Sequence, residues 1–344
     1  LPGKINEYRH MDVLEIQENI NGLSFRTAQE IIDISSDNID GFAELQLGGS
    51  STVTLHGKSL STISPMHFRI TPKIDSYIVG TDGNDALVGD DLNNYIKGST
   101  DTLRRTADGY DILDGGAGDD VLDGGVSVYA APGYDINIYR FDKNYGDDKI
   151  FGFFAADIYE EYSGIGTPKL EAGIQSDKIE IPNDVVLSAS TLITSANSNY
   201  DGWAELSFEG TTITLHMIPV SQLKNDYFHI IPRTSKTLVG TVGNDILVGG
   251  EANERLLGSD DPYDYSADGS DLLVGGGGDD ILNGGGANGY TRDRYRFNNN
   301  FGNDYLISFF AEDLCRTSCG TVNVEGEGIG SFDQQPSKVP VFSG

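Results

Sequence analysis

Basic residues, cysteine, methionine and tryptophan are all scarce in this chain of 344 residues. It has 23 lysines and arginines against 53 aspartates and glutamates, which gives a formal net charge of −30. This charge repels the phosphates of nucleic acids and of anionic lipids, so we expect neither as a direct partner. No run of about 18 apolar residues occurs, so the sequence predicts no membrane insertion.

Sequence motifs of common enzymes are missing as well. The five histidines do not form the zinc motif H-E-x-x-H, and neither a G-x-S-x-G nucleophile elbow nor a phosphate loop occurs. We therefore expect no enzyme activity here, and a structural role for the equivalent His56 and His216. The chain lacks an initiator methionine and an N-terminal signal pattern, so we expect a processed form or a piece of a longer chain.

Only two cysteines are present, Cys315 and Cys319. They fit an oxidising exterior without proving one. Neither has a counterpart in the first half of the chain, where Tyr159 and Ser163 stand at the matching places. A short local disulfide is favoured over a metal site, and mass measurement with and without reductant would decide between them.

What the chain does have is glycine and aspartate in a fixed spacing. Residues 115–123 read G-G-A-G-D-D-V-L-D, which is the nonapeptide G-G-x-G-x-D-x-U-x with a large aliphatic residue at U. The same phrase returns at residues 275–283 as G-G-G-G-D-D-I-L-N. This nonapeptide is the repeat of a calcium-binding parallel β-helix. Each repeat is expected to be half a coil, a metal-binding turn followed by a short strand.

The composition of the nonapeptide suits a hard cation. Glycine adopts positive φ without steric cost, so G-G-x-G can curl the backbone and aim its carbonyl oxygens inward. The aspartate at the sixth position adds carboxylate oxygens to the same loop. Calcium takes 6–8 oxygen ligands in flexible geometry. The sequence therefore predicts several Ca²⁺ ions in these turns, with the aliphatic residue pointing the other way into a thin core.

Most of the sequence occurs twice. Residues 78–85 match residues 238–245, and residues 108–111 match residues 268–271. Upstream of each glycine-rich block lie short runs with period-two alternation, which predict antiparallel strands. Among them we predict a strand at residues 31–34 and align residues 178–181 with it.

The predicted fold is all-β, with two tandem units that each consist of an antiparallel β-sandwich followed by a parallel calcium-binding β-roll. Aromatic residues near the end of the first block, among them Tyr134, Tyr139 and Phe153, are expected to pack it on the sandwich. The expected domains are 1–77 (N-terminal strands and sandwich), 78–155 (roll), 156–237 (connection and sandwich), 238–311 (roll) and 312–344 (tail, the possible start of a further unit).

The two glycine-rich blocks resemble the repeats-in-toxin (RTX) family of secreted calcium-binding proteins. The pairing of coil and sandwich is similar to the C-terminal regions of serralysin-type proteases and to the non-catalytic modules of alginate epimerases. The resemblance implies a right-handed β-roll with rows of calcium ions between coils. Carried over to this sequence, it implies ligands at Gly83, Asp85, Gly109, Asp111, Gly116, Gly118, Asp120, Gly243, Asp245, Gly269, Asp271, Gly276, Gly278 and Asp280.

The sequence departs from the family pattern at Asn94 and Glu254, which stand at the sixth position of poor repeats. Each block is also interrupted twice, so the number of ions is left open. The function we expect is a calcium-dependent structural or adhesive protein, part of a surface, matrix or filament array. Neighbouring copies of the same protein or repeat are its expected partners. We expect it outside the cell after bacterial export without an N-terminal signal.

The resemblance also allows an alternative function, the secretion-and-folding region of a larger exported enzyme such as a protease, lipase or epimerase. A catalytic domain upstream would favour this alternative, and further copies of the same unit would favour the array. A third possibility is a module that binds carbohydrate or ice, for which no residue selects a ligand. Trp203 is expected in the core rather than as a sugar platform.

Overall fold

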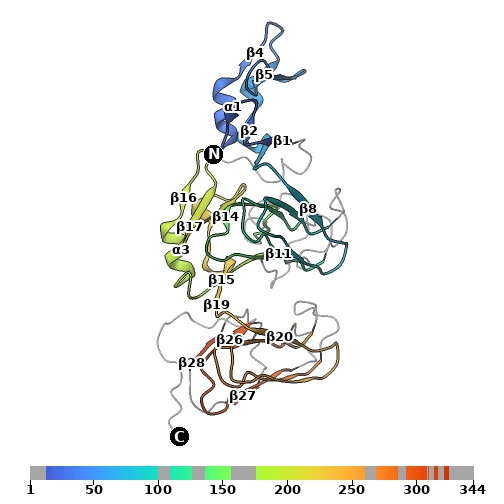
Figure 1. Ribbon diagram of the computed structural model, residues 1–344, viewed down its shortest axis with the longest axis vertical. Helices are drawn as coiled ribbons and strands as arrows, with labels where there is room; N and C mark the ends of the chain where they lie inside the picture. The colour runs from blue at the N-terminus through green and yellow to red at the C-terminus, as the bar shows by residue number, and fades with distance from the viewer. Residues whose placement is uncertain are drawn as a thin grey trace, which may run out of the picture. The chain divides into compact units, whose positions relative to one another are not determined.

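The fold is mostly β-structure in a computed structural model of the chain (Figure 1). The structure describes residues 13–99, 109–125, 136–155, 176–259, 269–285, 292–307 and 309, and the backbone of strands 314–316 and 321–324. No helix among these residues is long and apolar enough to cross a membrane. The chain forms two compact units, unit 1 (Leu1–Ile181 and Val185–His229) and unit 2 (Pro182–Asp184 and Ile230–Gly344).

Unit 1 contains a roll of two parallel sheets, here called roll 1. Asn94 lies beside Ser76, 18 residues earlier, which equals two nonapeptides per coil. The aliphatic side chains of Ile96, Leu113 and Leu122 are 0% exposed, as expected for the U positions. The strands of roll 1 are β8 (Ser76–Val79), β10 (Asn94–Lys97), β12 (Val121–Asp123) and β14 (Gly146–Phe151) in one sheet, and β9 (Ala86–Val88), β11 (Ile112–Asp114) and β13 (Ile138–Arg140) in the other.

A module of antiparallel strands and one short helix, the second module, continues both sheets of roll 1. Strand β18 pairs in parallel with β14, and β15 pairs in parallel with β13. As predicted, aromatic residues pack at this junction, since the Phe153 ring centroid lies 6.0 Å from that of Tyr139 and 5.5 Å from that of Tyr227. The predicted Tyr134 lies outside the described residues. The elements of the second module are β15 (Lys178–Pro182), α3 (Ala189–Ser195), β16 (Asn197–Ser198), β17 (Ala204–Phe208), β18 (Thr211–Leu215), η4 (Val220–Gln222), η5 (Asn225–Tyr227) and β19 (Phe228–Ile231).

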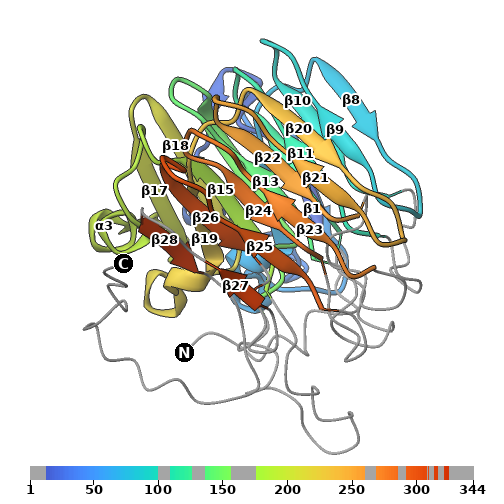
Figure 2. The same ribbon diagram turned by 90° about the horizontal axis from the view of Figure 1, so that it is seen from below.

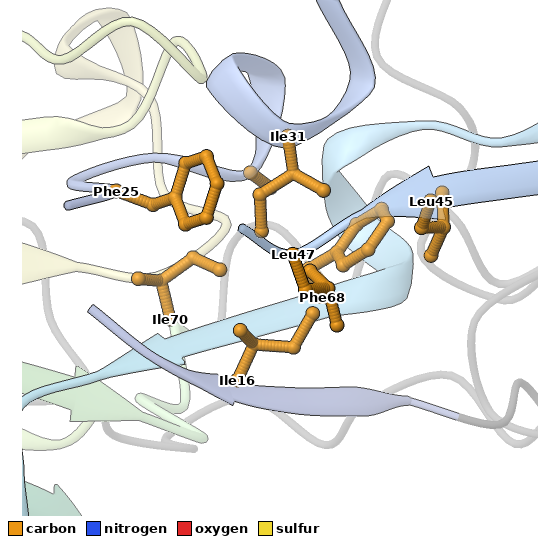
Figure 3. Packing of buried hydrophobic residues seen from close by; sticks show 8 residues of the cluster. Ile16, Phe25, Ile31, Leu45, Leu47, Phe68 and Ile70 are labelled. Carbon is orange, nitrogen blue, oxygen red and sulfur yellow. The ribbon is translucent and has the colours of Figure 1, made fainter. Parts of the chain in front are cut away.

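The first module of unit 1 packs a short helix against strands. Its core contains Phe25, Ile31, Leu45 and Phe68, all at most 4% exposed (Figure 3). Its elements are β1 (Leu14–Gln17), β2 (Asn19–Ile20), β3 (Leu23–Ser24), α1 (Ala28–Ile34), β4 (Ser36–Asp37), β5 (Ala43–Gln46), β6 (Thr52–Leu55), η2 (Leu60–Thr62), η3 (Pro65–His67) and β7 (Phe68–Thr71).

The strand predicted at residues 31–34 is wrong, because these residues belong to helix α1. The Glu30 side chain accepts the backbone N–H of Thr27 at 3.1 Å, which stabilises the first turn of the helix. Burial of Ile31 against the strands then outweighs the preference of β-branched residues for extended backbone. The core of the first module lies among helix α1, the antiparallel sheet β4-β5-β6 and the parallel pair β1-β7, so the predicted antiparallel sandwich is not confirmed.

Apart from β2 and β3, which have no counterpart in the second module, the two modules have the same order of elements, which corrects the predicted alignment. Helix α3 corresponds to α1, and β15 corresponds to β1 rather than to residues 31–34. The backbone supports this alignment, since the N–H of Glu18 donates to Thr71 O in one module as the N–H of Asn183 donates to Ile231 O in the other. The predicted domain boundaries stay predictions, although strand pairing joins the second module to roll 1.

Unit 2 contains a second roll of parallel strands, here called roll 2 (Figure 2). Its core holds Leu256, Leu273, Leu282 and Leu306, each 0% exposed. The strands are β20 (Lys236–Val239), β22 (Glu254–Leu257), β24 (Ile281–Asn283), β26 (Asn303–Ile307) and β28 (Thr321–Val324) in one sheet, and β21 (Ile246–Val248), β23 (Leu272–Val274), β25 (Arg294–Arg296) and β27 (Leu314–Arg316) in the other. The disulfide predicted between Cys315 and Cys319 lies outside the side chains that the structure describes.

Candidate metal centre

Aspartates of successive coils are linked into ladders along the edges of both rolls. In roll 1 the backbone N–H of Asn94 donates to Oδ1 of Asp120 at 2.7 Å, and the N–H of Asp120 donates to Oδ1 of Asp148 at 2.9 Å. On the other edge the N–H of Asp85 donates to Oδ1 of Asp111 at 2.9 Å. One oxygen of each of these carboxylates therefore holds the register between two coils.

Roll 2 repeats the same ladders. The N–H of Glu254 donates to Oδ1 of Asp280 at 2.8 Å, and the N–H of Asp280 donates to Oδ1 of Asp304 at 3.1 Å. On the other edge the N–H of Asp245 donates to Oδ1 of Asp271 at 2.8 Å. The sequence duplication is thus also a duplication of the aspartate geometry.

In five of the buried aspartates, the second carboxylate oxygen has no hydrogen-bond donor among the described residues. Among the described residues, Oδ2 is buried and unpartnered in Asp120, Asp148, Asp271, Asp280 and Asp304. A buried carboxylate without a partner is costly, because it has lost its hydration without compensation. This arrangement indicates a place for a cation beside each of these oxygens.

Glycines bring backbone carbonyl oxygens to the same edges. A Cβ atom on Gly116 would lie 2.5 Å from Asp90 O, and one on Gly118 would lie 2.7 Å from Leu92 O. Gly118 also has a φ of 127°, which only glycine adopts readily. The coils can therefore approach closely enough for carbonyls of one coil to lie against the glycines of the next.

Burial raises the pKa of these aspartates well above the ordinary value. Desolvation is the main cause, and it raises the pKa of Asp120 to about 7 and that of Asp148 to about 9. In roll 2 the pKa of Asp271 and of Asp280 is raised to about 6, and that of Asp304 to about 7, for the same reason. Without a cation, the charged carboxylates are therefore unfavourable in the folded chain.

The donor set fits calcium. Within the described segments, no three side chains of His, Cys, Asp or Glu are grouped closely enough to hold a metal by themselves. A cation at these edges would take a carboxylate oxygen and several backbone carbonyl oxygens, all hard ligands. Calcium accepts 6–8 such oxygens in irregular geometry, whereas Zn²⁺ prefers nitrogen and sulfur ligands.

The structure brings the predicted residues of each edge together. In roll 1, Gly109 stacks on Gly83, because a Cβ on Gly109 would lie 2.6 Å from Gly83 O. In roll 2, a Cβ on Gly269 would lie 2.1 Å from Gly243 O, and one on Gly276 would lie 2.1 Å from Gly250 O. That these glycines and aspartates are ligands stays a prediction.

Asp85 and Asp245 differ from the other predicted aspartates. Oδ2 of Asp85 accepts the N–H and the hydroxyl of Thr81 at 2.6 and 2.9 Å. Oδ2 of Asp245 accepts the same two groups of Thr241 at 2.7 and 2.9 Å. In the first coil of each roll, a threonine therefore donates hydrogen bonds to the second carboxylate oxygen. Asp85 and Asp245 are for this reason weaker candidates for calcium ligands than the other aspartates.

Sequence reasoning missed Asp148 and Asp304, which extend the ladders by one coil. Each follows a glycine by two residues, as Asp120 follows Gly118. Gly146 and Gly302 also lie against the preceding coil, because their Cβ atoms would be 2.0 and 1.9 Å from Gly118 O and Gly278 O. The shortened motif G-x-D is the sequence signal by which these two aspartates could have been predicted.

The second-module histidine has the structural surroundings that the sequence suggests. The His216 ring lies 4.0 Å from that of Trp203 and 4.6 Å from that of Phe151, measured between centroids. Burial lowers the pKa of His216 to about 3, so this ring is neutral at physiological pH. Trp203 is half-buried.

One comparison with known proteins concerns the same repeats. The model of the RTX calcium-binding nonapeptide repeat (4 copies) matches residues 105–126, 237–261 and 265–290. Among solved structures, the extracellular lipase LipA from Serratia marcescens matches with 19% sequence identity and a TM-score of 0.17. That match covers 73% of this chain and 33% of the lipase chain. None of the curated proteins matches the chain. The chain thus carries the RTX calcium-binding nonapeptide repeats that its sequence resembles, in both of its units.

Proposed function

We propose that this chain is a structural segment of an exported protein, whose rolls fold and stiffen when they bind calcium. The observation that supports this most directly is the row of buried aspartate oxygens without donors, such as Oδ2 of Asp120 and Asp148. Calcium bound there would neutralise these carboxylates and would take its remaining oxygen ligands from backbone carbonyls of the glycine-rich turns. The RTX repeat match supports the choice of metal.

The charge of the chain explains why folding would depend on the ion. With a net charge of −30 and a thin core, an ion-free roll combines carboxylate repulsion with little apolar burial. Calcium binds the folded form and stabilises it by mass action, by about 2.7 kcal/mol per site at a hundredfold excess over Kd. In this proposal the rolls are unfolded where calcium is scarce, and they fold and become rigid outside the cell, where calcium is abundant.

The test is circular dichroism of the full chain during calcium removal. We expect the strand signal to fall when EGTA is added and to return when calcium is restored, whereas magnesium at equal concentration should not restore it. Full strand content in saturating EGTA contradicts the proposal. A mutant with Asn at both Asp120 and Asp280 should need more calcium for the same signal.

We place this segment in a surface, matrix or filament array rather than in the folding region of an exported enzyme. The array is supported by the two modules, whose elements follow one order apart from β2 and β3, and by the continuous sheets that join roll 1 to the second module. Calcium-dependent self-association of the chain would support the array. Calcium-dependent folding of a chain that stays monomeric would favour the enzyme-associated role.

A further inference from the structure

The two modules of unit 1 differ in what lies beside one equivalent strand. In the second module, β18 pairs with β17 on one side and with roll strand β14 on the other. In the first module, the equivalent strand β6 pairs only with β5 among the residues that the structure describes. The edge that receives a roll in one module is therefore open in the other.

The neighbouring strand shows the same difference. Strand β15 pairs with roll strand β13, and Nε of Arg140 on β13 lies 2.9 Å from the carboxylate of Glu180 on β15. The equivalent strand β1 pairs only with β7 in the described part of the chain. Glu15 of β1 corresponds to Glu180 and is exposed. We call the outer sides of β1 and β6 the free edge.

Burial follows the pairing. Ile213 and Leu215 of β18 are 0% exposed, whereas Val53 of β6, the counterpart of Ile213, is 36% exposed. The ring of His216 packs against that of Phe151 of the roll, while its counterpart His56 is exposed. An open strand edge with an exposed valine is a template for pairing with another strand.

We propose that the free edge docks the terminal coil of roll 2 from a second copy of this chain, as roll 1 docks on the second module. This inference rests on the proposed function and names the surface through which an array would form. Strand β27 would pair with β1, and strand β28 with β6, both in parallel.

Residues at matching register positions support a second copy as the occupant. Among the described strands, β27 is the outermost of its sheet, and its Arg316 pairs in register with Arg296, the counterpart of Arg140. Arg316 of β27 therefore continues the register position of Arg140, the residue that pairs with Glu180 at the end of roll 1. Strand β28 reads T-V-N-V and β6 reads T-V-T-L, so the two strands share one alternation.

Such a contact joins two different surfaces. A heterologous contact of this kind builds open chains or rings instead of closed two-fold dimers. Each copy would expose one free edge and one roll end. Association should therefore continue beyond the dimer as concentration rises, and should require calcium, because the coil that docks must be folded.

A single backbone donor provides a selective test. The N–H of His216 donates to Ile150 O at 3.1 Å, so the alternate residues of β18 present their N–H groups to roll 1. Their counterparts on β6, His56 and Thr54, therefore present N–H groups to the free edge. Proline is tolerated on an edge strand when its missing N–H faces solvent. Thr54→Pro should thus leave the single chain folded and block docking.

The experiment is sedimentation velocity of the full chain in calcium and in EGTA, with circular dichroism of the same samples. Wild type and the matched control Thr54→Ser should form calcium-dependent species larger than dimers, and Thr54→Pro should stay monomeric with an unchanged strand signal. Glu15→Arg should weaken association at least tenfold. A wild type that folds with calcium but stays monomeric overturns this inference alone, as does association of Thr54→Pro at wild-type strength. Absence of calcium-dependent folding would instead contradict the proposed function.

Discussion

The backbone N–H of Asp120 donates to Oδ1 of Asp148 at 2.9 Å, while Oδ2 of both residues is buried without a donor among the described residues. One oxygen of each carboxylate thus organises the chain, and the other is left for a ligand. The first role can be filled by any acceptor, whereas the second needs negative charge. This division allows the two roles to be separated by mutation.

We expect Asp120→Asn to weaken calcium binding without unfolding roll 1. The amide oxygen can still accept the N–H of Asn94, but the negative charge is lost. Calcium affinity at this edge should fall at least tenfold, or about 1.4 kcal/mol. Isothermal titration calorimetry measures the change, with Asp40→Asn as control because Asp40 lies on an exposed turn of the first module. Unchanged affinity and stoichiometry would show that Asp120 is not a ligand.

The ion-free chain should become more stable as the pH falls. Burial raises the pKa of Asp148 to about 9 and that of Asp120 to about 7 in the folded chain, from an ordinary value of 3.8. Between about pH 9 and pH 4 the folded form binds protons that the unfolded form does not, so the free energy of unfolding of the ion-free chain increases as the pH falls. This gain in stability is complete below about pH 4, where both forms are protonated. Calcium competes with these protons, so its stabilising effect should shrink as the pH falls through about 7.

Thermal unfolding between pH 9 and 5 measures both effects, in EGTA and in saturating calcium. The Tm in EGTA should rise as the pH falls, and the difference between the two conditions should narrow. Asp148→Asn serves as the matched variant, because it should reduce the pH dependence in EGTA. If the Tm in EGTA instead decreases as the pH is lowered from 9 to 5, the buried carboxylates do not have the raised pKa values given above.

The rolls could be predicted from the sequence because their structure is local. Each nonapeptide specifies its own turn through Gly116, Gly118 and Asp120, and its own buried residue through Leu122. Asn94 and Glu254 were recognised as departures, and both still donate their N–H to the aspartate of the next coil. A repeat that sets its own conformation needs no information from distant parts of the chain.

The modules could not be predicted as well, because their contacts are long-range. Residues 31–34 are rich in isoleucine and alternate like a strand, and only Thr27 followed by Glu30 signals a helix start. The N-terminus of α1 also has a hydrogen-bond partner 173 residues away, since the N–H of Ala28 donates to Oδ2 of Asp201 at 3.0 Å. No local pattern indicates that contact.

We expect Gly118→Ala to destabilise the calcium-loaded roll more than an alanine at another glycine of positive φ. The new Cβ would lie 2.7 Å from Leu92 O, so this carbonyl must move. Gly41→Ala is the matched control, because Gly41 has a φ of 80° and nothing within 4 Å of its Cβ position. The control should cost roughly 1–2 kcal/mol from the left-handed backbone conformation alone. Equal losses of Tm in calcium would show that the coils do not need this close approach.

We expect Asp201→Ala to loosen helix α1, although the two are far apart in sequence. Its two carboxylate oxygens accept the N–H groups of Ala28 and Gln29 at 3.0 and 2.9 Å, which caps the helix from the second module. Loss of a cap typically costs about 1 kcal/mol. Ser188→Ala is the control, because Ser188 caps α3 within its own module by accepting the N–H of Thr191 at 3.2 Å. Both variants should lose similar stability, but only Asp201→Ala should speed hydrogen exchange of the α1 amides. Unchanged exchange in α1 would mean that the first module folds independently of this contact.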